Sequence, residues 1–84
     1  MAIAIIAPGA TTAGDTINLP DGAPAIDKIV NAFIFRGSDA SDAASIVTCT
    51  ATKVKTSDTS ITLDVDTTDR DLIVLYYIAK GERI

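Results

Sequence analysis

The segment Leu72 to Ala79 consists of eight apolar residues in a row, and it constrains the fold of this 84-residue chain more than any other feature. In a strand, successive side chains point to opposite faces of the sheet, so both faces of this segment would be apolar. One face would carry Leu72, Val74, Tyr76 and Ile78, and the other Ile73, Leu75, Tyr77 and Ala79. A two-layer domain of this length has a single core, so one of these faces needs a cover from elsewhere.

The residue types in the chain favour strands over helices. Of the 84 residues, 28 are the β-branched types Ile, Val and Thr, whereas Leu, Glu, Gln, Lys and Arg, the good helix formers, are scarce. Turn signals such as Pro20-Asp21-Gly22, in which Pro fixes φ and Gly accepts a positive φ, divide the chain into short pieces. Strands are predicted at residues 2–7, 15–19, 26–36, 46–55, 60–66 and 71–80.

The pattern within these strands and the spacing between them predict the fold class. The first strand, closed by Pro8-Gly9, is expected at a sheet edge, and residues 60–66 alternate without a break. That alternation predicts buried Ile61, Leu63 and Val65, and outward Thr62 and Asp64. The gaps leave no room for crossover helices, so the strands are expected to be antiparallel. The sequence therefore predicts one all-β domain over residues 1–84, a small antiparallel β-sandwich or jelly-roll-like barrel of about six to eight short strands.

Several function classes are disfavoured by the chemistry that the sequence lacks. It has no His and no GxSxG, SxxK or P-loop pattern, so we expect neither an enzyme nor a bound cofactor. The single Cys49, in a Thr-rich predicted strand, is expected to be a small core residue. The net charge of -4 argues against nucleic acid as a partner, and no uncharged apolar run approaches the ~20 residues that span a membrane.

An acidic cluster near the last strand raises the question of a cation site. The cluster consists of Asp64, Asp66, Asp69 and Asp71. Carboxylate oxygens are the ligands that Ca²⁺ prefers, so a Ca²⁺- or carbohydrate-binding β module that uses Asp64, Asp66 and Asp69 is an alternative function. The Gly and Glu of an EF-hand loop are absent, however, and the favoured interpretation is a solvated, charged strand end that discourages edge pairing.

Two segments, residues 32–35 and 72–77, are apolar on both faces and indicate an interface. Aromatic residues are enriched in the buried centres of interfaces, so the expected interface residues are Phe33, Phe35, Tyr76 and Tyr77. Because a tyrosine hydroxyl prefers a polar rim, one of the adjacent tyrosines is expected at the edge of the core and the other in the contact. The favoured interpretation is a homo-oligomer; the alternative is that the domain's own loops wrap these strands.

The start MAIAIIAPGATTAGDTINLPDG, followed by β-rich segments of Thr, Asp and Ala and a compact end, resembles the small virion structural proteins of tailed bacteriophages, especially head decoration or cement proteins. The resemblance covers the whole chain in style and includes no diagnostic motif. It implies a small β-sandwich assembled in many copies on a capsid, without catalysis. The implied partners are further copies of the chain and the major capsid or another virion protein. The implied location is the virion, assembled in the host cytoplasm.

Overall fold

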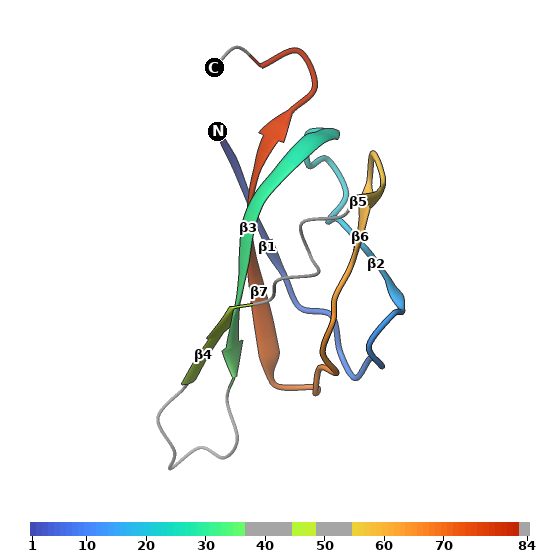
Figure 1. Cartoon of the computed structure of the whole chain (residues 1–84), viewed down its shortest axis with the longest axis vertical. Helices are drawn as coiled ribbons and strands as arrows, with labels where there is room; N and C mark the ends of the chain where they lie inside the picture. The colour runs from blue at the N-terminus through green and yellow to red at the C-terminus, as the bar shows by residue number, and fades with distance from the viewer. Residues whose placement is uncertain (37–44, 49–54, 83–84) are drawn as a thin grey trace.

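The computed structural model describes residues 1–36, 45–48 and 55–82, and these residues form strands, turns and loops without a helix. The strands in this described part are β1 (Ala2–Ile6), β2 (Thr16–Asn18), β3 (Ile26–Arg36), β4 (Ser45–Thr48), β5 (Lys55–Ser57), β6 (Ser60–Thr62) and β7 (Asp71–Ala79). They build two antiparallel sheets that face each other, which confirms the predicted all-β fold class (Figure 1).

The larger sheet has the strand order β1-β7-β3-β4, so the doubly apolar strand β7 lies between two neighbours. At its centre, Leu75 pairs with Ala4 of β1 on one side and with Ala32 of β3 on the other. The register of β3 against β7 shifts at two bulges, between Ile26 and Lys28 and between Ile29 and Asn31. Bulges bend a strand, and β3 curves at its start toward the second sheet (Figure 1).

The smaller sheet, in the order β2-β6-β5, consists of strands of only three residues each. It packs its apolar side chains against one face of the larger sheet, and the two layers share one core. The buried apolar residues of this core are Ala4, Ile6, Ile17, Leu19, Ile26, Ala32, Ile34, Ile61, Leu63, Ile73, Leu75 and Tyr77. Every second residue of β7 from Ile73 to Tyr77 therefore lies inside, as the alternation predicts.

The structure corrects two predicted strand boundaries. The strand predicted at 46–55 contributes to both sheets, because β4 pairs with β3 while β5 pairs with β6. The strand predicted at 60–66 ends at Thr62, because the next residues turn to the loop after β1: the Gly14 amide donates to the Leu63 carbonyl at 3.0 Å. The predicted alternation holds from Ile61 to Asp64, with Ile61 and Leu63 buried and Asp64 exposed, although Thr62 and Val65 are only partly buried. Ser60 breaks it, because Ser60 is buried next to Ile61. Cys49 lies outside the described residues.

Asp58, in the turn between β5 and β6, connects this turn to the larger sheet. Its carboxylate accepts hydrogen bonds from Lys55 Nζ at 2.9 Å and from Lys80 Nζ, just after β7, at 2.8 Å. Its carbonyl accepts the amide of Ile26, at the start of β3, at 2.7 Å. The Lys80 and Lys55 ammonium groups hold the pKa of the Asp58 carboxyl below its ordinary value.

Leu63→Ala tests the core. Leu63 is almost fully buried, so we expect the variant to lose ~2 to 5 kcal/mol of unfolding free energy, the usual range for truncating a buried leucine. Chemical denaturation monitored by circular dichroism measures this loss. Val65→Ala is the matched control and should cost clearly less, because Val65 is only partly buried. Equal losses in the two variants would show that Leu63 is no more enclosed than Val65.

Asp58→Asn tests the connection between the sheets through its pH dependence. The carboxyl pKa is lower in the folded chain than in the unfolded one, so the ionised group stabilises the fold above its unfolded pKa of about 3.9. That contribution is lost as the pH falls through the lower folded value. We expect wild type to have a higher urea midpoint than Asp58→Asn at pH 7 and the difference to disappear well below pH ~3.9. A difference that is unchanged in acid would show that the ion pairs do not contribute.

Candidate functional site

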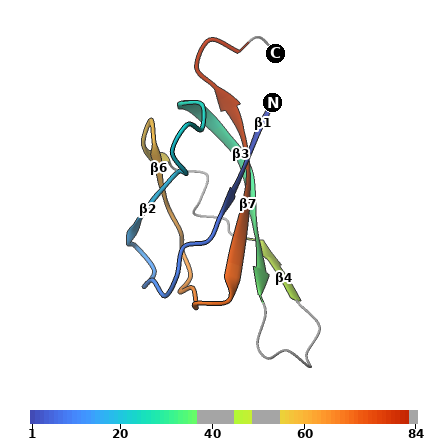
Figure 2. The same ribbon diagram turned by 180° about the vertical axis from the view of Figure 1, so that it is seen from behind.

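The larger sheet has one covered face and one open face. The three-stranded sheet lies against one side of it, and the opposite side faces outward with no second layer of described residues in either view (Figure 2). We call this opposite side the outer face, and its apolar residues are Ile3, Ile5, Phe33, Phe35, Leu72, Val74, Tyr76 and Ile78.

The strand register makes these residues contiguous. Directly paired residues of antiparallel strands share a face. Val74, in the middle of β7, pairs with Ile5 of β1 and with Phe33 of β3, which gives a continuous apolar row across three strands. A second row joins Tyr76 to Ile3.

An aromatic pair lies at the centre of the outer face. The rings of Phe33 and Tyr76 pack edge to face, with centroids 5.9 Å apart and an interplanar angle of 86°. This is a favourable geometry for two aromatic rings, and it fixes both side chains against the sheet. The centre of the outer face is therefore a preorganised aromatic surface.

Several apolar side chains of the outer face are exposed and lie next to one another, which is unusual for a protein surface. Ile3 and Ile5 are 59% and 63% exposed, and Leu72 and Phe35 are 44% and 39% exposed. Single exposed apolar residues are normal on a folded protein, but a contiguous apolar patch marks an interaction surface. Among the described residues paired with β7 on this face, Lys28 at one end carries the only charge. Within residues 1–36, 45–48 and 55–82, no loop wraps this face.

The predicted interface residues divide between the two sides of the sheet. Phe33, Phe35 and Tyr76 lie together on the outer face, whereas Tyr77 is fully buried in the core. The Tyr77 hydroxyl donates to the Pro24 carbonyl at 2.8 Å, and burial raises its pKa. The prediction that Tyr77 is an interface residue was therefore wrong. Adjacent residues of a strand point to opposite faces, so Tyr77 lies in the core when Tyr76 lies on the outer face.

Ile3 and Ile5 also belong to the outer face, although they were not among the predicted interface residues. The signal for them is the alternation of Ala2-Ile3-Ala4-Ile5 in an edge strand. That pattern identifies an outer face only once β1 is known to pair with β7, and the strand order is set by tertiary packing.

The carboxylates of the acidic cluster accept hydrogen bonds from backbone amides of nearby loops. Asp66 Oδ1 accepts the Ala13 amide at 2.7 Å, and Asp69 Oδ1 accepts the Ala10 amide at 3.1 Å. Asp71 is buried, and its Oδ2 accepts the Thr68 amide at 2.9 Å. Binding a cation through Asp66 and Asp69 would compete with the hydrogen bonds that hold the loop after β1. In the part of the chain that the structure describes, no three His, Cys, Asp or Glu side chains converge as a possible metal-binding group.

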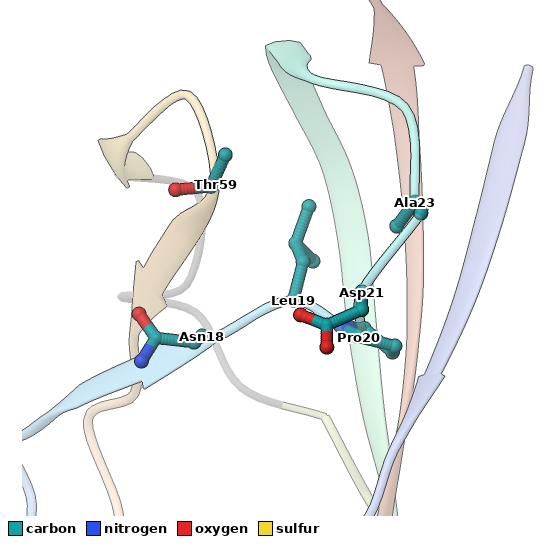
Figure 3. Close-up of a pocket in the computed structure, with 7 residues that line it drawn as sticks. Asn18, Leu19, Pro20, Asp21, Ala23 and Thr59 are labelled. Atoms are coloured by element: carbon teal, nitrogen blue, oxygen red, sulfur yellow. The ribbon is translucent and has the colours of Figure 1, made fainter.

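A shallow hollow of about 350 Å³ lies at the turn after β2, on the side of the smaller sheet (Figure 3). Its lining residues are Asn18, Leu19, Pro20, Asp21, Gly22, Ala23 and Thr59, none of which is aromatic. The polar side chains of Asn18, Asp21 and Thr59 are spread around the hollow (Figure 3). Ligand sites typically combine apolar walls with a few convergent polar groups, and this hollow does not have that arrangement.

Comparison with known proteins gives no relative from which a function could be transferred. The chain matches no protein-family model, no curated protein and no solved structure. Within residues 1–36, 45–48 and 55–82, no helix has the length and apolar character needed to cross a membrane. The outer face, which is defined by its geometry alone, is the strongest candidate for a functional site in the described structure.

Proposed function

We propose that this chain is a non-enzymatic structural protein that works by burying the outer face of its four-stranded sheet against another protein surface. The single observation that carries the proposal is the contiguous apolar row Ile5, Val74 and Phe33 on an uncovered sheet face. Burying apolar surface contributes roughly 25 cal/mol per Å², so covering this face drives association.

The composition of the outer face supports a protein partner. The aromatic pair has aliphatic Ile3 and Val74 beside it and Asn31 as the polar neighbour of Tyr76. This fits an interface centre, where Tyr and Phe are enriched and charges are depleted. A nucleic acid would require a clustered basic surface, and Lys28 is an isolated charge at the end of this face. The face therefore fits a protein surface that is itself apolar.

The surface that we propose as the partner is a virus capsid. The resemblance to head decoration and cement proteins of tailed bacteriophages supports this choice, and so does the small β-sandwich form that such proteins are expected to have. In this proposal the chain self-associates and packs against the major capsid protein, which stabilises the phage head by surface burial. The virion is accordingly its site of action.

Tyr76→Asp tests the proposed function. Tyr76 lies on the outer face and contributes nothing to the core, so the variant should keep the fold while a charge enters the contact. We expect self-association to weaken by at least roughly 30-fold, which corresponds to ~2 kcal/mol or more for a central interface residue. Sedimentation velocity over a concentration series measures the change, and circular dichroism confirms folding.

Thr16→Asp is the matched control, because it adds the same charge to an exposed position of the smaller sheet. It should sediment like wild type. If wild type and both variants sediment alike as single chains and wild type does not copurify with virus particles, the assembly proposal is wrong, and a Ca²⁺- or carbohydrate-binding module takes its place.

A further inference from the structure

The free edge of β1 is a second apolar feature, distinct from the outer face. β1 ends the order of the larger sheet and pairs with β7 on one side; among the described residues no strand pairs with its other side. It runs from Ala2 to Ile6 with no charge, no proline and no bulge. Natural proteins usually protect such an edge, because its unpaired backbone groups accept another strand.

The two edges of the smaller sheet have the protection that β1 lacks. β2 and β5, the edges of the smaller sheet, have three residues each. Thr16 and Asn18 make β2 polar, and β5 consists of Lys, Thr and Ser. β4, the opposite edge of the larger sheet, is flanked in sequence by residues outside the described part of the chain. Short and polar edges discourage pairing, so β1 is better suited to pair with another strand than either edge of the smaller sheet.

We propose that β1 pairs with β1 of a second copy of this chain, antiparallel, to make one continuous eight-stranded sheet. Two identical antiparallel strands of five residues pair over their full length only when the two copies of the central residue, Ala4, face each other across the twofold axis. Ile3 then lies opposite Ile5 of the partner subunit, and Ala2 lies opposite Ile6 of the partner subunit. Opposed β-branched side chains are favourable cross-strand pairs.

This pairing places the outer faces of both copies on the same side, because the twofold axis is perpendicular to the sheet. The nine residues of β7 span about 30 Å and the three strands β1, β7 and β3 about 14 Å, so one outer face offers a footprint of roughly 400 Å². A standard interface buries about 800 Å² per partner. Two copies joined at β1 together supply that area. The link to a partner surface rests on the proposed function, whereas the pairing of the two β1 strands does not.

Disulfide trapping of a mixture of Ile3→Cys and Ile5→Cys, both with Cys49→Ser, tests the pairing and its register. In the proposed register, position 3 of one copy faces position 5 of the other at a distance that a disulfide spans, whereas like positions are ~7 to 8 Å apart or more. With one variant labelled by ¹⁵N, mass spectrometry distinguishes mixed from like dimers. We expect mixed dimers to exceed like dimers several-fold. Circular dichroism of both variants, which alter exposed positions, confirms folding.

Thr16→Cys with Cys49→Ser is the control for random collision, because it places a thiol at an edge of the smaller sheet. Mixed dimers no more abundant than the Thr16→Cys dimers, or than the like dimers, would overturn the proposal. Adding Tyr76→Asp to the trapping pair separates this proposal from the proposed function. Trapping that persists supports the β1 pairing even if the outer face proves functionless, and trapping that is lost shows that the dimer forms through the outer face instead.

Discussion

The structure depends on one constraint, the presence of β7 as a central strand whose two faces are both apolar. Such a strand must have neighbours on both edges and a layer on at least one face, and β1, β3 and the three-stranded sheet provide these within the chain. The chain is too short to build a third layer from its described strands. The inner face is therefore a core, and the outer face remains an apolar surface.

The polar residues of the chain hold the second layer on the inner face. Asp58 connects the β5–β6 turn to Lys80 and to the backbone of Ile26, and Asp66 and Asp69 bind the loop after β1. These hydrogen bonds lie around the core and away from the outer face. The acidic character of the chain thus coexists with an outer face on which Lys28 is the only charged residue among those paired with β7.

Much of the fold follows from the sequence because hydrophobic periodicity is local. The boundaries of β3, the turn at Pro20 and the alternation around Leu63 are all set by neighbouring residues, and the structure confirms them. The division of 46–55 between two sheets was not predictable, since a change of sheet depends on tertiary pairing. The same reason explains the outer face: Phe33, Phe35 and Tyr76 were identified by residue type, whereas Ile3 and Ile5 required the pairing of β1 with β7.

Hydroxyl-radical footprinting tests whether the outer face is buried when the protein assembles. Oxidation of Tyr76 and Phe33 would be measured over a concentration series alongside the native mass, with Pro20 on the smaller sheet's side as an internal reference. Burial of the outer face predicts that oxidation of both rings falls once the mass rises above that of the dimer paired through β1, in which the outer faces stay open, while oxidation of Pro20 stays constant. It is contradicted if Tyr76 and Phe33 stay as reactive in concentrated protein as in dilute protein, or if the mass remains that of a single chain throughout.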